Sequence, residues 1–137
     1  MPELNFTPEQ RAAIDTRGST VLVSAAAGSG KTRVLTERLM AYLTDAENPV
    51  DIDRFLVITY TRAAAAELRS RILDGIYARI ASDPENRRLR RQVALCARAE
   101  IGTIHSFCAD FLRANCAALA LAPDFQVADT ERCAALR

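Results

Sequence analysis

The sequence predicts an α/β protein with a parallel sheet and crossover helices. Two short apolar runs, 20–24 (TVLVS) and 55–59 (FLVIT), have the length and β-branched content of buried strands. Each run is followed by a turn and then by a segment with helical periodicity. Strands that alternate with helices pair in parallel through crossover connections, which is the arrangement of nucleotide-binding sheets.

The first half of the chain divides clearly into elements. Thr7 as N-cap, Pro8 in the first turn and Gln10 three residues after the cap predict a helix over 8–16, which Gly18 ends. The run 20–24 is expected to be a buried strand. A glycine turn follows, and a helix is expected from about 31 to 44.

The middle of the chain continues the alternation. Residues 45–53 are expected to form a loop, and 55–59 a second buried strand. A helix over about 63–81 is predicted by an apolar stripe at every fourth position: Leu68, Ile72, Ile76 and Ile80. Asp83-Pro84 is expected to start another helix that runs to about residue 99.

The remaining segment predicts a short third strand over 101–104 and a helix over 105–116. Pro123 is expected in a loop, and Asp129 is expected to cap a last helix that the chain end interrupts. About three strands are visible, and open sheets of this kind usually have more. We therefore expect an N-terminal part of a longer protein.

Composition narrows the class of protein without identifying it. The chain has 137 residues and a net charge of +1, so any nucleic-acid binding must be local. It contains no apolar stretch of membrane-spanning length, and its N-terminus does not resemble a secretory signal, so a cytoplasmic location is expected. The four cysteines lack CxxC spacing, which predicts buried free thiols rather than a metal cluster.

The glycine turn indicates phosphate binding. In Gly28-Ser29-Gly30-Lys31-Thr32 the glycines allow backbone conformations that other residues resist, and they let N–H groups approach a ligand closely. The following helix offers free N–H groups to an anion. Lys31, the sole lysine among 18 basic residues, would reach the β- and γ-phosphates, and Thr32 would ligate Mg²⁺. The common pattern has glycine where this chain has Ala25, so the strand-turn-helix context carries much of the prediction.

The roles of three further stretches are open from the residues alone. Thr59-Tyr60-Thr61 ends a predicted parallel strand, and the alanines after Arg62 begin a helix that either packs on the sheet or contacts phosphate. Thr103 to Phe107 contains the only histidine, His105, whose role is structural or ligand-binding. The basic run 87–91 is a solvated helix face or a nucleic-acid contact.

One expected feature is missing. Hydrolysis of ATP needs an acidic residue after a buried strand to hold Mg²⁺ and polarise water, but the run 55–59 ends in Thr59. Asp129 follows a segment that is too short and too polar for a buried strand, and no arginine is placed as a finger.

Together these stretches resemble the N-terminus of superfamily 1 DNA helicases of the UvrD/RecB type, and helicase-nucleases of the AddA kind are the nearest likeness. Leu4-Asn5 with Gln10 resembles the adenine-recognising Q motif, and Ala25 to Thr32 resembles motif I, in which an initial alanine is common. The stretches from Thr59 and from Thr103 resemble motifs Ia and Ib. Residues 122–129 are similar to the segment that precedes an inserted helical subdomain.

The resemblance implies a partial RecA-like P-loop NTPase domain over 1–117, and the truncated start of the helical subdomain over 118–137. It implies ATP and Mg²⁺ as cofactors, single- or double-stranded DNA as partner, and a second, AddB-like repair protein bound to the longer protein. The expected nucleotide-binding residues are Gln10, Ala25, Ala26, Ala27, Gly28, Ser29, Gly30, Lys31, Thr32 and Arg33, with Lys31 and Thr32 catalytic and Thr32 also the magnesium ligand. The expected DNA-binding residues are Thr59, Thr61, Arg62, Ala64, Thr103 and His105.

The resemblance favours a fragment that binds Mg·ATP and single-stranded DNA but cannot unwind DNA alone, within an ATP-dependent helicase of double-strand-break repair. A small P-loop phosphotransferase is the alternative, although no lid or substrate site for one is visible. A non-catalytic single-strand-binding module would not need Lys31 and Thr32, and it would usually be richer in aromatic residues.

Overall fold

The computed structural model describes residues 5–122, 124–128 and 130–135. Leu4, Pro123 and Asp129, for which the sequence predicted roles, lie outside the described residues. The helices and strands, with two short 3-10 helices (η), are α1 (Pro8–Asp15), α2 (Lys31–Leu43), η1 (Ile52–Arg54), β1 (Leu56–Thr59), α3 (Arg62–Ser82), α4 (Arg87–Cys96), β2 (Glu100–Thr103), α5 (Ile104–Ala114), η2 (Cys116–Leu119) and α6 (Thr130–Ala135). Among the described helices, none is both long and apolar enough to cross a membrane.

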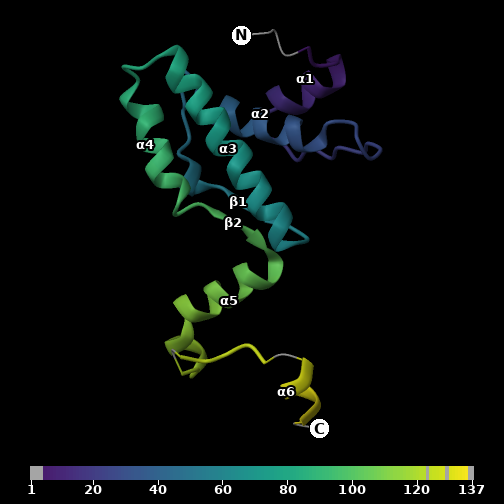
Figure 1. Cartoon of the computed structure of the whole chain (residues 1–137), viewed down its shortest axis with the longest axis vertical. Helices are drawn as coiled ribbons and strands as arrows, with labels where there is room; N and C mark the ends of the chain where they lie inside the picture. Colours follow the sequence, from purple (N-terminus) through teal and green to yellow (C-terminus); the bar gives the residue numbers. More distant parts are fainter. Residues whose placement is uncertain (1–4, 123, 129, 136–137) are drawn as a thin grey trace.

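Helices α1 to α4 form one body with the two strands, and α5 and the C-terminal segment extend away from it (Figure 1). The strands β1 and β2 pair in parallel, with Val57 opposite Ile101 and Thr59 opposite Thr103. The connection between them is the α3–α4 pair, as the alternation of strand and helix predicted. The parallel arrangement is therefore confirmed, on a sheet of two strands in the described part of the chain.

The core lies between α2, α3, α4 and one face of this sheet. Ile72 and Ile76 of α3 are fully buried, and they belong to one apolar cluster with Met40 of α2 and with Val57 and Ile101 of the strands. The predicted stripe of α3 is thus the packed face of this helix. The other face of β1 is open, with Leu56 50% and Ile58 45% exposed, so the predicted burial of this strand holds only for the face that carries Val57.

The predicted strand 20–24 is not formed. No described residue pairs with this segment, Leu22 is 92% exposed and Val23 is 46% exposed. Only Val21 packs inward, against the small cluster of Ala13, Ile14 and Val34. Apolar composition predicted burial correctly for part of the segment, but a strand also needs a backbone neighbour, and the described residues provide none.

The start of α4 also differs from its prediction. Asp83-Pro84 lies in a turn, and the helix begins at Arg87, where the Asn86 side chain accepts a hydrogen bond from the Leu89 N–H at 3.1 Å. The prediction relied on Pro84, because proline is common in the first turn of a helix. The helix start is instead set by Asn86, whose side chain accepts a hydrogen bond from the N–H group three residues later. The helix ends at Cys96, three residues earlier than expected.

Free thiols were predicted correctly, but their burial was predicted correctly only for Cys96. All four cysteines are free, and Cys96 is buried in the core, whereas Cys108 and Cys133 are exposed and Cys116 is half-buried. Cys108 lies on α5, a helix in which no residue is buried. No group of residues in the described part of the chain is suited to hold a metal ion through histidine, cysteine or carboxylate side chains.

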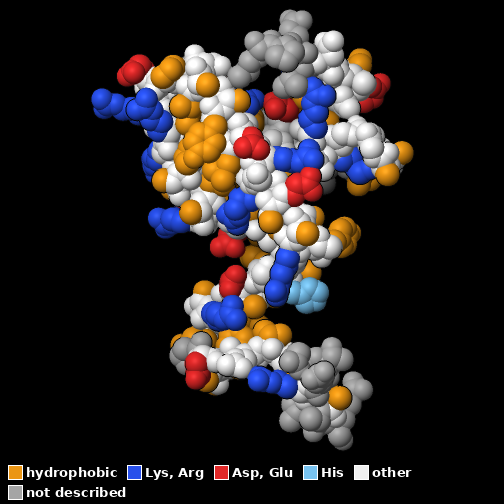
Figure 2. All heavy atoms as spheres, viewed as in Figure 1, with side chains coloured by type: hydrophobic (Ala, Val, Ile, Leu, Met, Phe, Trp, Pro, Cys, Tyr) orange, Lys and Arg blue, Asp and Glu red, His pale blue; other side chains and the backbone are white. Residues whose placement is uncertain are grey.

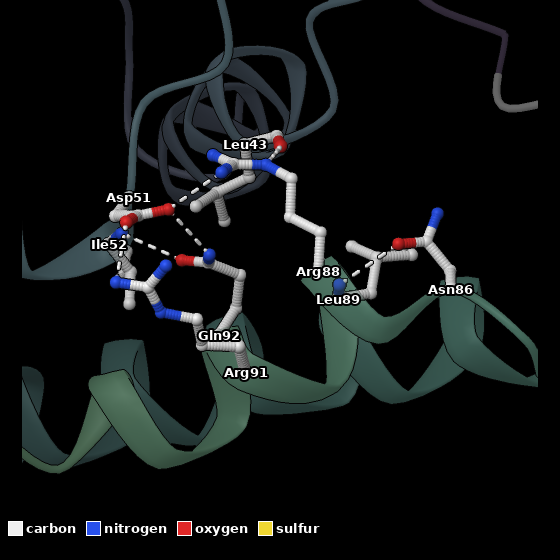
Figure 3. A network of polar contacts seen from close by, with 8 residues as sticks. All are labelled: Leu43, Asp51, Ile52, Asn86, Arg88, Leu89, Arg91 and Gln92. Carbon is white, nitrogen blue, oxygen red and sulfur yellow. Dashed lines mark hydrogen bonds and ion pairs between the residues drawn. The ribbon is translucent and has the colours of Figure 1, made fainter.

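Two arginines of the basic run 87–91 form ion pairs within the fold. Arg88 pairs with Asp51 at 2.9 Å and Arg91 with the same carboxylate at 3.5 Å, while the buried Gln92 donates to it at 2.8 Å (Figure 3). The network fixes the segment that leads into β1 against α4. Arg87 and Arg90 are exposed and form no ion pair among the described residues, so a nucleic-acid contact stays a prediction for these two only.

Asp51 is expected to make stability depend on pH. The hydrogen bond from Gln92, with the nearby charges of Arg88 and Arg91, lowers the pKa of Asp51 below its ordinary value of 3.8, against the opposing effect of burial. A lowered pKa in the folded state stabilises the fold above pH 3.8, and the stabilisation is lost as the pH falls through the folded-state pKa.

Asp51→Asn should therefore reduce the free energy of unfolding at pH 7 by about 1 kcal/mol, and the difference from the parent chain should shrink towards pH 2. Urea unfolding at both pH values measures it. Asp74→Asn, at an exposed position of α3 outside the network, is the matched control. Equal losses at pH 7 and pH 2 would show that the ion pairs do not stabilise the fold.

Candidate functional site

The loop before α2 has the backbone that its glycines predicted. Gly28 and Gly30 have φ of 79° and 84°, a region that residues with a Cβ rarely adopt. The loop therefore turns tightly before α2 begins at Lys31. Any other residue at 28 or 30 would strain this turn.

The amine of Lys31 lies inside the loop. Its Nζ donates hydrogen bonds to the carbonyl oxygens of Ala25 at 2.7 Å and Ala26 at 2.6 Å. Lys31 is exposed, so the amine can exchange these carbonyls for another acceptor that enters from solvent. The arrangement places one positive charge at the mouth of the loop.

The N-terminus of α2 is open to an anion. Its N-cap is Gly30, which has no side chain to accept a hydrogen bond from the first helical N–H groups. These N–H groups and the positive end of the helix dipole lie next to the Lys31 amine. Thr32, in the same first turn, is exposed. The combination is suited to a phosphate group.

Helix α1 is tied to this loop through Gln10. Thr7 and Gln10 form the predicted capping box, in which Gln10 Oε1 accepts from the Thr7 N–H at 3.0 Å. The other end of the amide, Nε2, donates to the Ser29 carbonyl at 3.1 Å. Gln10 therefore links helix α1 to the glycine loop. The sequence did not predict this hydrogen bond to Ser29. Recognition of adenine by Gln10 stays a prediction.

Arg33 lies over an aromatic ring that sequence reasoning missed. Its guanidinium is 4.6 Å from the ring centre of Phe6, and the guanidinium of Arg11 is 5.3 Å from the same centre. Phe6 also packs against the cluster under α1. An apolar residue just before an N-cap commonly packs onto its own helix, and this signal could have identified Phe6.

A pocket of about 370 Å³ lies between α1, the loop and α2. Its lining residues are Thr7, Glu9, Gln10, Ala13, Val23, Ser24, Ala25, Ser29, Lys31 and Val34. Gln10, Ala25, Ser29 and Lys31 of the expected nucleotide-binding set thus meet in one place. Thr32 and Arg33 lie just beyond it, in the first turn of α2.

The motif Ia and Ib stretches meet at one edge of the sheet. Thr59 and Thr103 are register partners at the carboxyl ends of β1 and β2. Thr61 and Thr103 are N-caps, because their hydroxyls accept from the N–H groups of Ala64 at 3.0 Å and Ser106 at 3.2 Å. Thr59 donates to the Thr61 carbonyl at 2.9 Å. These threonines set where α3 and α5 start, and their contact with DNA stays a prediction.

A cleft of about 470 Å³ lies along α5 at this edge, between the helix and the segment 125–127, with Arg62 at the start of α3 also lining it. It is lined by Arg62, His105, Ser106, Ala109, Asp110, Arg113, Phe125, Gln126 and Val127. Arg62 and His105, predicted from separate stretches, therefore share one cleft. Figure 2 shows the histidine on the surface with a basic side chain beside it. Sequence reasoning missed Arg113 and Phe125, because only the fold brings 124–128 back to α5.

The two candidate sites are separate in the described structure, since the pocket and the cleft share no lining residue. Tyr60 precedes the cleft and is fully exposed, so it presents an uncovered aromatic ring near the start of α3. The last residue of β1 is Thr59, as the sequence indicated, so this strand does not end in a carboxylate that could polarise water.

Comparisons with known proteins agree with these features. Residues 6–136 match the family model of the UvrD/REP helicase N-terminal domain. The chain is 53% identical over 125 residues to an ATP-dependent helicase/nuclease subunit of Clostridium acetobutylicum, and the match covers 91% of this chain and 10% of the relative.

Two further relatives carry the same name. The protein of Thermoanaerobacter sp. is 53% identical over 124 residues, which cover 90% of this chain and 10% of the relative. The protein of Clostridium novyi is 50% identical over 129 residues, which cover 94% of this chain and 10% of the relative. This chain spans about a tenth of the length of the curated relatives that it matches.

Proposed function

Because this chain belongs to the UvrD/REP helicase family, we propose that it forms the nucleotide-binding N-terminal part of an ATP-dependent DNA helicase of the AddA kind. Residues 1–117 would belong to the first RecA-like domain, and 118–137 would begin an inserted helical subdomain. The relatives are named as subunits, so a second, AddB-like protein is the proposed partner in double-strand-break repair, with DNA in the cytoplasm as substrate. A small P-loop phosphotransferase has no support from these comparisons.

The observation that carries the proposal is the position of Lys31. Its amine lies within the loop, 2.7 Å and 2.6 Å from the Ala25 and Ala26 carbonyls, beside an uncapped helix N-terminus. A triphosphate would take the place of these carbonyls as acceptor, and it would also receive hydrogen bonds from the first N–H groups of α2. Such a change needs only a side-chain movement of an exposed lysine.

The residues at this loop fit a bound Mg²⁺ only together with the nucleotide. The Thr32 hydroxyl is exposed in the first turn of α2, and no cluster of three acidic, histidine or cysteine side chains exists in the described residues to hold the ion alone. Magnesium in such sites keeps one or two protein ligands, and phosphate and water oxygens supply the others. When bound, it would neutralise charge on the β- and γ-phosphates.

Single-stranded DNA is the proposed partner of the edge formed by the ends of β1 and β2. The N-terminus of α3 carries Arg62 and the exposed Ala64, and the neighbouring α5 carries the exposed His105. Backbone N–H groups at helix starts and an arginine suit phosphates, and the exposed ring of Tyr60 suits a base.

ATP turnover by the 137-residue chain tests the proposal. We expect the chain to bind Mg·ATP and single-stranded DNA but to show no multiple turnover, with or without DNA, because neither β1 nor β2 ends in a carboxylate that could hold Mg²⁺ and polarise water. Phosphate release measures turnover, and a fluorescent ATP analogue measures binding. DNA-stimulated turnover that Lys31→Ala removes would contradict this expectation, and absence of nucleotide binding would contradict the proposed function.

A further inference from the structure

The cleft along α5 contains an aromatic ring and three basic side chains that no single motif brings together. Phe125 is half-buried, and the Arg113 guanidinium is 5.6 Å from its ring centre. Arg62 enters the cleft from the start of α3 and His105 from the start of α5. The ring is thus held in place at one wall, while basic groups lie around it.

The orientation of Arg113 is fixed by a second contact. Its Nη1 donates to the Asp110 carboxylate at 2.8 Å, one turn earlier on α5. The ion pair is about half exposed, so its contribution to stability is small. The ion pair helps to hold the guanidinium beside Phe125, whereas Arg62 and His105, the other basic groups of the cleft, form no ion pair in the described structure.

We propose that this cleft binds one nucleotide of a single strand, with the base stacked against Phe125 and the adjoining phosphate on Arg62. This inference rests on the proposed DNA-binding function and extends it to 124–128 and to Arg113. A cleft of about 470 Å³ is large enough for a nucleotide. Aromatic rings combined with basic groups are the usual platform for single strands, because every base has a stacking face.

The polar residues that line the cleft do not make it specific for one base. Ser106, Asp110 and Gln126 line it, but the Ser106 hydroxyl is engaged with Thr103, and the Gln126 amide accepts from Arg132 at 3.0 Å. Side chains that already form hydrogen bonds within the protein are poorly placed to form base-specific hydrogen bonds. The cleft is therefore expected to accept any base, with strength set by stacking.

A fluorescence experiment tests the stack directly. The chain contains no tryptophan, so Phe125→Trp introduces a single indole into the cleft. Titration with a dT oligonucleotide should quench this emission as the base stacks on it. Tyr77→Trp, at an exposed aromatic position of α3 outside the cleft, is the control and should not be quenched.

Affinity measurements separate the two proposals. Anisotropy of a labelled single strand should show about tenfold weaker binding for Phe125→Leu, unchanged binding for Tyr77→Leu, and no effect of Phe125→Leu on an abasic strand. Arg62→Ala should instead reduce the slope of log affinity against log salt by about one phosphate contact. If the parent chain binds DNA but Phe125→Trp is not quenched, the cleft proposal is wrong and the DNA-binding proposal stands. If the parent chain does not bind DNA, both are wrong.

Discussion

Lys31→Ala is expected to weaken ATP binding by roughly 30- to 150-fold, which corresponds to the loss of a charge-assisted contact worth about 2–3 kcal/mol. The chain has no other lysine, and the Lys31 amine is the positive side-chain group that lines the pocket between α1, the glycine loop and α2. A loss of this size should remove detectable binding of a fluorescent ATP analogue at micromolar concentrations.

The fold should survive this change. The Lys31 amine bonds the Ala25 and Ala26 carbonyls, and both residues are exposed, so water can replace the amine. Thermal unfolding of Lys31→Ala should therefore match that of the parent chain. Arg71→Ala is a suitable control, because Arg71 is an exposed basic residue that pairs with Glu67 on the same helix, away from the loop. Equal ATP affinity in Lys31→Ala and Arg71→Ala would exclude the loop as the phosphate site.

Gln92→Ala is expected to cost about 2–3 kcal/mol of folding free energy, the largest stability effect we predict for a polar residue. The Gln92 side chain is fully buried, and its Oε1 accepts from the Ile52 N–H at 2.9 Å, itself in a fully buried residue. Alanine would leave that N–H without a partner and would also remove the donor to Asp51.

Urea unfolding at pH 7 measures this effect, with Arg90→Ala as the control two residues earlier on α4. Arg90 is exposed and forms no ion pair in the described structure, so its loss should change stability by less than about 0.5 kcal/mol. A similar small loss for Gln92→Ala would mean that the Ile52 N–H finds another partner and that the network of Figure 3 is dispensable.

Local features of the sequence were reliable guides. The capping box of Thr7 and Gln10 was predicted and is present, since both hydrogen bonds lie within one helical turn. The stripe of α3 was predicted from spacing alone, because the helical period places these side chains on one face. The glycines at 28 and 30 were expected to allow an unusual backbone, and they have positive φ. In each case the residues that interact are near neighbours in the chain.

Features that depend on distant neighbours were predicted poorly. The segment 20–24 has the composition of a strand, but no described backbone pairs with it. The run 87–91 could not be divided by sequence into Arg88 and Arg91, which pair with Asp51, and Arg87 and Arg90, which form no ion pair in the described structure. That division depends on a carboxylate in the segment before β1, far from α4 in the chain.

By itself, the sequence determined the order of the main helices, the parallel strand pairing, the backbone of the glycine loop and, through its resemblance, the UvrD/REP family that the comparisons then showed. Only the tertiary structure decided that Gln10 bonds Ser29, that Phe6 lies under Arg33, and that Phe125 shares a cleft with Arg62. The physical reason is the distance along the chain between the residues that interact. Caps, turns and periodic stripes are set by interactions within a few residues, whereas a site wall exists only after packing brings remote segments together.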